Sequence, residues 1–275
     1  NSGGPLFNME GEVIGINTAI ISPSGGSIGI GSSIPSQIPA NVVDQLGKYG
    51  ETRRGWLGVR IQPVTDEVAE SLDMPSAKGA LVAGVIKGGP VTHGEIQPGD
   101  VIVKFDGRDI KEMHELPRIV AESPVGKDVD VVLIRKGKEQ TIRIKLGRLE
   151  DGDKLASADE GQPDRAAPEK KQPDLGVVFG MKLGALDDAM RKRFGIADTV
   201  SNGVVITDVQ ADSAAAEKGV AAGDVITEIT QQAVSKPKDV TDRIAALKSQ
   251  GRKAVLLMLA EKNGDLRFVT IRIDS

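Results

Sequence analysis

Gly79-Ala-Leu-Val-Ala-Gly-Val-Ile86 is an apolar run that opens with glycine, and Gly203-Val-Val-Ile-Thr-Asp-Val-Gln210 repeats its pattern. Each run is followed at equal distance by a second shared stretch, Gly99-Asp100-Val101-Ile102 in one case and Gly223-Asp224-Val225-Ile226 in the other. Two paired signatures at a fixed spacing are typical of duplicated modules. The sequence therefore predicts two homologous domains.

Each predicted module continues with a helix and a closing pair of strands. The turns between those strands, 135–138 and 261–265, contain the Gly and Asn residues that hairpins favour. The pattern predicts two α+β modules. The expected helices are 113–122 and 238–249, and the expected strand pairs are 129–134 with 140–145 and 254–259 with 266–273.

The composition along the chain suggests where these modules begin and end. We place the first module at 51–148 and the second at 174–275. Residues 149–173 between them are rich in Asp, Glu, Lys, Ala, Pro and Gln with almost no large apolar side chain, which predicts a flexible linker.

Residues 1–48 form a third unit, with strand candidates at 12–21 and 27–34 and a helix candidate at 39–49. Two strands and a helix are too little for an independent core. We therefore expect this unit to be the final part of a larger domain.

The bulk composition narrows the classes of protein. Glycine reaches 33 residues and aromatics only 3%, which predicts a mainly β protein with many tight turns. The net charge of -4, with both signs interleaved, argues against nucleic acid as a partner. No apolar run is long enough for a transmembrane helix. No signal peptide opens the sequence, but this says little because the sequence does not begin with Met.

Metal and disulfide chemistry are not expected, and neither is a cofactor. The chain has no cysteine, and its two histidines, His93 and His114, lie far apart in the sequence and are too few to complete a normal metal ligand set by themselves. We expect both histidines to lie exposed in a loop or helix.

Asn1-Ser2-Gly3-Gly4-Pro5-Leu6, followed by Gly11-Glu-Val-Ile-Gly-Ile-Asn-Thr-Ala19, resembles the nucleophile loop and next strand of trypsin-fold proteases. More narrowly it is similar to the Do-like/HtrA family of periplasmic serine endoproteases. Ser27-Ile-Gly-Ile-Gly-Ser-Ser-Ile-Pro35 resembles the last barrel strand of that family. The resemblance extends through both modules, and it implies the C-terminal part of a trypsin-like β-barrel followed by two PDZ domains.

The resemblance implies that Ser2 is the catalytic nucleophile and that its own N–H is one oxyanion donor. A glycine before Asn1 would supply the other donor, and Asn17, Thr18 and Ala19 would align the substrate backbone. Small residues after the serine would permit the close approach that acyl transfer needs. For the tetrapeptide alone, a plain turn remains the alternative.

In the trypsin fold the triad runs His, Asp, Ser along the chain. The resemblance therefore places both partners of Ser2 upstream of Asn1, and neither His93 nor His114 is a credible general base. We expect residues 1–275 alone to lack peptidase activity, since triad members act as a unit.

A PDZ domain binds a peptide C-terminus as an added strand, with the carboxylate held by backbone N–H groups of an apolar-Gly-apolar loop. The resemblance points to Leu57, Gly58 and Val59 in the first module and to Leu175, Gly176 and Val177 in the second. A purely structural strand start is the alternative, and it is more plausible for the second module, which could serve assembly instead.

Two repeated aspartates, Asp100 and Asp224, directly follow a turn glycine. We interpret them as cap or turn residues because no catalytic partner repeats beside them. The second module has Gly219 before this turn where the first has Glu95 with Gly94 adjacent. We expect the left-handed turn of the first module to be shifted by one residue.

These observations favour an ATP-independent serine endopeptidase that degrades misfolded proteins in the bacterial periplasm, with possible chaperone activity. The sequence has no glycine-rich phosphate-binding loop followed by Lys and Ser or Thr, which agrees with ATP independence. The resemblance also implies a trimer-based homo-oligomer. A non-enzymatic PDZ protein that binds or holds peptides is the alternative, and a PDZ-bearing Ser-Lys peptidase is a third, against which the strand-rich first unit argues.

Overall fold

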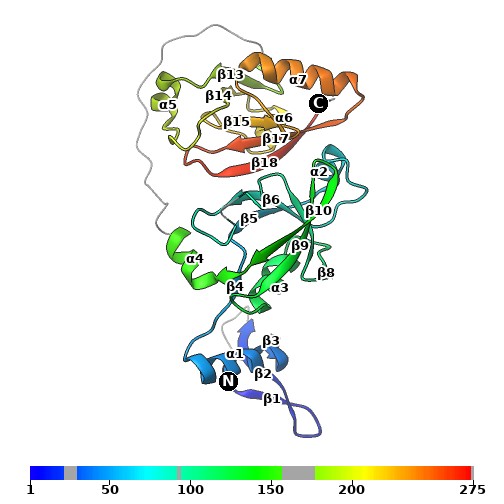
Figure 1. The fold of residues 1–275 in the computed structure, drawn as a ribbon, viewed down its shortest axis with the longest axis vertical. Helices are drawn as coiled ribbons and strands as arrows, with labels where there is room; N and C mark the ends of the chain where they lie inside the picture. The colour runs from blue at the N-terminus through cyan, green and yellow to red at the C-terminus, as the bar shows by residue number, and fades with distance from the viewer. Residues whose placement is uncertain (22–29, 92–93, 157–176, 274–275) are drawn as a thin grey trace. The chain divides into compact units, whose positions relative to one another are not determined.

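The computed structural model describes residues 1–21, 30–91, 94–156 and 177–273 of the chain (Figure 1). Their contacts divide it into two compact units, Asn1–Arg53 and Arg54–Ser275. Both units are built mostly from antiparallel strands with a few helices, which confirms the predicted fold class. Within the described ranges, no helix combines the length and apolar character needed to cross a membrane.

The first unit is a three-stranded sheet in the order β1-β2-β3, followed by one helix. Among its described residues only Gly15 is buried, and Met9 is 98% exposed. Strand β1 was not predicted from the sequence. Its elements are β1 (Pro5–Phe7), β2 (Val13–Ile21), β3 (Ile30–Pro35) and α1 (Gln37–Tyr49).

A large apolar surface of the first unit has no cover within the unit. Apolar side chains on the strands, on the turn between β1 and β2 and on α1 are exposed, so the described residues of this unit bury no apolar core. The exposed side chains are Leu6, Phe7, Met9, Val13, Ile14, Ile34, Ile38, Val43, Leu46 and Tyr49.

The first module is a sheet in the order β10-β9-β7-β6-β5, with β8 beside β7 and a small separate pair of β4 with β11. Helix α3 packs Leu116, Ile119 and Val120 into the core. The elements are β4 (Gly55–Trp56), β5 (Val59–Pro63), α2 (Asp66–Ser71), β6 (Ala80–Val85), β7 (Val101–Phe105), β8 (Arg108–Asp109), α3 (Glu115–Glu122), β9 (Asp128–Arg135), β10 (Lys138–Lys145) and β11 (Gly147–Arg148).

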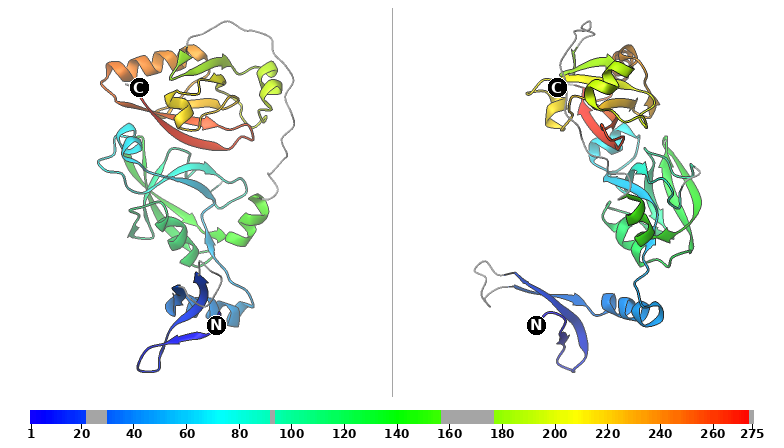
Figure 2. Two further views of the ribbon diagram at one scale, coloured as in Figure 1. Left: turned by 180° about the vertical axis from the view of Figure 1, so that it is seen from behind. Right: turned by 90° about the vertical axis from the view of Figure 1, so that its left-hand side faces the viewer.

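The second module repeats this plan in the order β12-β13-β14-β15-β17-β18, with β16 beside β15. Helix α7 runs along its sheet (Figure 2) and buries Val240 and Leu247. The elements are β12 (Val177–Val178), β13 (Met181–Ala185), α5 (Asp188–Phe194), β14 (Val204–Val209), α6 (Ala214–Glu217), β15 (Val225–Ile229), β16 (Gln232–Ala233), α7 (Pro237–Ser249), β17 (Ala254–Ala260) and β18 (Leu266–Arg272).

The predicted linker differs from the structure at its start. Residues Leu149–Ala156 form helix α4, whose first residue donates its N–H to Arg54 O at 3.0 Å. Gly152 lies against the indole of Trp56, where a Cβ would come within 2.5 Å of the ring. The sequence pattern missed this helix because its contact is made through a glycine instead of a large apolar side chain.

The two modules share one apolar cluster. From the second module, Leu256 on β17 is 1% exposed and Phe268 on β18 packs beside it. These side chains meet the outer face of the first sheet and helix α2. We call this set the shared cluster: Val68, Ala69, Leu72, Met74, Leu81, Val101 and Val103 with Leu256, and Val64, Ala77, Val132, Ile134 and Phe268 packed against them.

Candidate functional site

The loop that carries Ser2 is fastened to strand β2 by backbone hydrogen bonds. Gly3 N donates to Asn17 O at 2.7 Å, and Asn17 N donates to Gly4 O at 2.9 Å. The exposed Ser2 hydroxyl donates to Thr18 O at 2.9 Å. The structure therefore brings together three of the residues that the sequence singled out, Ser2, Asn17 and Thr18.

Small residues are needed in this loop for geometric reasons. Gly3 has a φ of 83°, in the left-handed region. A Cβ at Gly4 would lie 3.1 Å from Asn1 O. The next strand is held from its other side, since Ser33 Oγ donates to Asn17 Oδ1 at 2.7 Å, and Ala19 follows a bulge in the pairing of β2 with β3. Ser2 thus sits on a constrained, exposed turn beside a strand.

No histidine occurs in the unit that holds Ser2, residues 1–53. His114 belongs to the first module, is exposed, and lies with its Nδ1 3.2 Å from Glu112 Oε2. His93 lies outside the described residues. The described part of the chain also holds no cluster of three His, Cys, Asp or Glu side chains that could bind a metal. Within the unit that holds Ser2, the hydroxyl therefore has no histidine beside it.

In the first module, the turn at Leu57 and Gly58 leads into strand β5, which begins at Val59. Leu57 is buried in the core, and Gly58 has a φ of 76°. Gly58 O accepts from Ile86 N at 2.8 Å, and a Cβ at Gly58 would lie 2.8 Å from Pro90 Cδ. Only glycine meets both conditions, the left-handed φ and the close approach to the proline ring.

Strand β5 has one open edge. It pairs with β6 along one side and is the last strand in the order of its sheet, so no other described strand pairs with it. Val59 and Ile61 pack toward the first core, which also contains Leu116 and Val120 of α3. Apolar side chains and unpaired backbone groups therefore lie next to the Gly58 turn, as an added peptide strand requires.

The residues before the Gly58 turn leave this edge open because they pair elsewhere. Trp56 on β4 pairs with Gly147 on β11. Its ring is enclosed by backbone, since a Cβ at Gly89 would lie 3.2 Å from it and one at Gly147 3.3 Å. The incoming chain is thereby directed away from β5.

In the second module, the turn equivalent to Gly58 is at Phe179 and Gly180. Gly180 has a φ of 83°, and its O accepts from Gln210 N at 2.9 Å, which matches the bond from Ile86 N to Gly58 O. Val177, which the sequence assigned to the second peptide site, begins β12 and lies before this turn. Leu175 and Gly176 are outside the described residues.

The incoming chain of the second module takes a different course. Val178 pairs with Met181 and Val177 with Lys182, so β12 lies along the edge of β13 that faces away from β14. Phe179 is left-handed too, with a φ of 53°, which is the geometry of a tight two-residue hairpin. The edge of β13 is therefore covered at its start by the chain itself.

The repeated aspartates have the turn role that the sequence predicted. Asp100 accepts from Gln97 N at 2.8 Å, and Asp224 accepts from Ala221 N at 3.1 Å. The left-handed glycine of the first module, Gly94, is one residue earlier than the position of Gly219, so the expected shift is present.

The sequence did not reveal that each buried aspartate is also paired with an arginine. Asp100 is 1% exposed and accepts from Arg135 Nε at 2.7 Å and from Arg135 Nη2 at 2.6 Å. These bonds raise the pKa of Arg135. Asp224 accepts from Arg267 Nη2 at 2.8 Å. Arg135 lies on β9 and Arg267 on β18, so the two modules reach the same contact from different strands.

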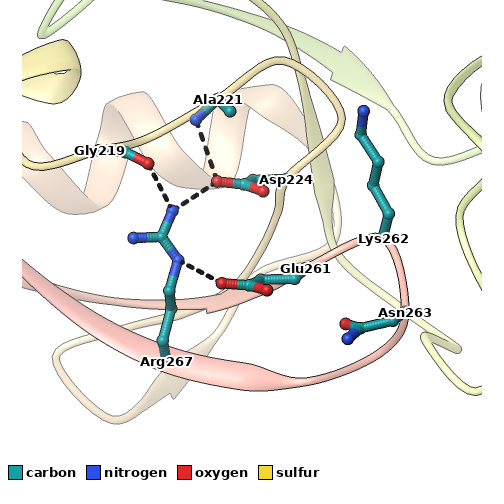
Figure 3. Close-up of a pocket in the computed structure, with 7 residues that line it drawn as sticks. All are labelled: Gly219, Ala221, Asp224, Glu261, Lys262, Asn263 and Arg267. Atoms are coloured by element: carbon teal, nitrogen blue, oxygen red, sulfur yellow. Dashed lines mark hydrogen bonds and ion pairs between the residues drawn. The ribbon is translucent and has the colours of Figure 1, made fainter. Parts of the chain in front are cut away.

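Figure 3 shows the pocket around Arg267, a cavity of about 450 Å³. Arg267 Nη2 also donates to Gly219 O at 2.8 Å, and Arg267 Nε lies 3.1 Å from Glu261 Oε1. The charged groups of Asp224, Glu261 and Arg267 thus pair with one another and hold the turn that contains Gly219 and Asp224. We assign this pocket a structural role.

Comparison with known proteins gives three results. The family described as PDZ domain matches residues 55–146 and 173–271. Proteins named probable periplasmic serine endoprotease DegP-like match nearly all of the chain, with 37% identity over 273 residues in Bartonella henselae and 39% over 274 residues in Brucella suis. The chain spans about half the length of these curated relatives, 51% and 50%.

Among solved structures, a variant of the HtrA-type protease AlgW with a decapeptide is similar at a TM-score of 0.50 and 38% identity. The similarity covers 54% of this chain and 45% of that one.

Gly58→Ala should destabilise the chain more than Gly107→Ala. Gly107 also has a positive φ, 78°, but has nothing within 4 Å of its Cβ position, so its substitution should cost only about 1–2 kcal/mol of backbone strain. The contact with Pro90 should add about 1–3 kcal/mol for Gly58. Urea denaturation of both variants measures the difference. Equal losses would show that Pro90 does not constrain this turn.

Arg135→Ala should lower the free energy of unfolding by about 3–5 kcal/mol, because it leaves the buried Asp100 carboxylate unpaired. Arg143→Ala is the matched control, since Arg143 pairs with Asp130 on the exposed side of the same hairpin. It should change stability by no more than about 0.5 kcal/mol. Similar chemical denaturation midpoints for the two variants would contradict a structural role for the buried pair.

Proposed function

This chain belongs to the PDZ domain family, and because nearly its whole length matches DegP-like periplasmic serine endoproteases, we propose that it works within an ATP-independent serine endopeptidase of that kind. In this proposal the first unit supplies the nucleophile and the two modules handle substrate or assembly. The division into 1–48, 51–148, a linker at 149–173 and 174–275 is part of the proposal. The two ranges matched by the PDZ family support it, although α4 now takes the first residues of the linker.

The observation that carries the binding half of the proposal is the open edge of β5 beside the Gly58 turn. A peptide C-terminus would pair with β5, and its carboxylate would accept hydrogen bonds from the backbone N–H groups of Leu57, Gly58 and Val59. Apolar side chains of the peptide would meet the apolar core beside α3.

For the second module, we propose that the counterpart of this turn is Phe179, Gly180 and Met181 and not Leu175, Gly176 and Val177. The matching φ and the matching hydrogen bond to Gly180 O support this assignment. The sequence favoured the earlier triplet because Leu-Gly-Val has the same letters in both modules.

Ser2 is the proposed nucleophile. In the first step a general base would take the proton of Oγ while Oγ attacks the scissile carbonyl, and the N–H of Ser2 would donate to the resulting oxyanion. The oxyanion would then collapse, the C–N bond would break, and the base would pass its proton to the leaving amine. Water, activated by the same base, would then hydrolyse the acyl-enzyme and restore the Ser2 hydroxyl. The constrained turn and the adjacent strand residues Asn17, Thr18 and Ala19 support this role, since the strand could pair with the substrate backbone.

In this proposal the base and the second oxyanion donor would come from residues outside 1–275. No histidine lies in residues 1–53, and the glycine that would precede Asn1 is not in the sequence. To act, the Ser2 hydroxyl has to turn from Thr18 O toward that base.

The cellular part of the proposal follows from the relatives. We place the protein in the periplasm, where it would degrade misfolded envelope proteins as a trimer-based homo-oligomer, without a cofactor and with a possible chaperone activity. The names of the relatives support the compartment and the reaction. The exposed apolar surface of the first unit agrees with a barrel completed by further residues. A protein that only binds or holds peptides remains the alternative for these residues alone.

The chain should bind a fluorescent peptide that has an apolar residue at a free C-terminus, with micromolar affinity. Its amidated copy should bind at least about tenfold more weakly, a difference of about 1.4 kcal/mol, because amidation removes the carboxylate that the Gly58 turn would hold. Fluorescence anisotropy measures both. Equal binding of the two peptides, or of neither, would remove carboxylate capture from the proposal.

In the longer protein, Ser2→Ala should reduce hydrolysis of an unfolded protein substrate by about 10⁶-fold. Ser36→Ala is the control, because the Ser36 side chain makes no capping hydrogen bond to α1 and should leave turnover unchanged. Release of labelled fragments measures the rate. Turnover that survives Ser2→Ala would exclude Ser2 as the nucleophile and favour the holding function.

A further inference from the structure

We propose that the second module acts as a fixed support for the peptide-binding strand of the first module and not as a second peptide receptor. The proposal rests on the peptide capture at β5 proposed above. It assigns Gln62 and Arg60 as positioning residues, because they join the back of β5 to the hairpin of β17 and β18.

Side chains of β5 alternate between two partners. Val59 and Ile61 pack toward the core beside α3. Gln62 faces the second module, where its Oε1 accepts from Phe268 N at 2.7 Å. Arg60 pairs with Asp265, in the turn between β17 and β18. One strand therefore offers its edge and one row of side chains to a peptide, while the other row is held by the second module.

Besides these polar contacts of Gln62 and Arg60, the two modules bury apolar side chains against each other in the shared cluster. Leu256 of the second module and Leu81 of the first are each 1% exposed, and Val101 is completely buried. Separation of the modules would expose these side chains to water, at roughly 1.5–3 kcal/mol for each large one. The hydrophobic effect therefore favours the docked arrangement.

Polar contacts around the cluster fix the orientation of the modules. Arg252 Nη1 donates to Glu70 O at 3.0 Å and its Nη2 to Asp73 Oδ2 at 2.8 Å, which lowers the pKa of Asp73. Gln231 Nε2 donates to Gly99 O at 3.1 Å. Exposed ion pairs add little energy individually, but the bonds to the Glu70 and Gly99 carbonyls favour this docking geometry because their acceptors are fixed in the backbone.

The second module is less suited to receive a peptide itself. Its edge strand β13 is already paired with β12 at Met181 and Lys182, next to the Gly180 turn. In the first module, by contrast, Trp56 pairs with β11 and leaves β5 open. A peptide could pair at the start of β13 only after β12 had been displaced.

Docking and peptide capture should then be coupled in both directions. If the docked second module holds β5 in the shape that binds peptide, a bound peptide must stabilise docking by the same free energy. The amide N–H of Phe268 reports on docking directly, because its acceptor is the Gln62 side chain.

The test uses the whole chain, residues 1–275, and the peptide with a free apolar C-terminus. Gln62→Met keeps the length of the side chain but removes the acceptor, and Gln62→Glu keeps an acceptor oxygen. Arg143→Ala is the control on an exposed strand pair of the same module. We measure the peptide Kd and stoichiometry by calorimetry and the hydrogen exchange of the Phe268 amide.

We expect one peptide per wild-type chain and slower exchange at Phe268 when peptide is bound. Gln62→Met should weaken binding about fivefold or more and accelerate that exchange, whereas Gln62→Glu and Arg143→Ala should bind within about twofold of wild type.

Two peptides per chain, or an unchanged Kd in a Gln62→Met chain whose Phe268 amide exchanges faster, would overturn the proposal while leaving peptide capture intact. Should Gln62→Met not fold, the wild type alone decides, since a Phe268 amide that saturating peptide does not slow also overturns it. Absence of any peptide binding by the wild type would instead refute the proposed capture at β5, and this proposal with it.

Discussion

The last strand of a sheet carries a row of backbone N–H and C=O groups that need partners, and this requirement shapes both modules. The two modules meet it in opposite ways. In the first, the chain before the Gly58 turn pairs with β11 and leaves β5 open. In the second, the chain before the Gly180 turn folds back and pairs with β13. A duplicated fold has thus acquired one open edge and one closed edge.

The two modules neutralise the same buried aspartate with arginines from different strands. Each module buries an aspartate behind its turn glycine and balances it with an arginine. The arginine comes from β9 in the first module and from β18 in the second, where Glu261 joins it. A buried carboxylate is destabilising unless a cation pairs with it. Both modules therefore keep the arginine–aspartate pair, although the arginine comes from a different strand in each.

The apolar faces show a similar contrast between the two units. In the second unit, which contains both modules, Leu256 and Phe268 of the second module cover the outer face of the first module's sheet. The two sheets thus share one apolar cluster. On the first unit, side chains such as Phe7 and Val43 stay exposed. A sheet face of this kind is stable in water only when another layer covers it. The described residues of the first unit lack such a layer, whereas the two modules supply it to each other through the shared cluster.

The sequence by itself determined the duplicated modules, the long helix and the closing strand pair of each module, and the turn role of Asp100 and Asp224. These features depend on local periodicity, turn chemistry and short spacings, which are visible along the chain. Only the tertiary structure decided that Gly180 takes the place of Gly58, that Arg135 and Arg267 neutralise the aspartates, that α4 covers Trp56, and that Gln62 binds the second module. Each of these depends on side chains or backbone far apart in sequence, for which no local pattern specifies the partner.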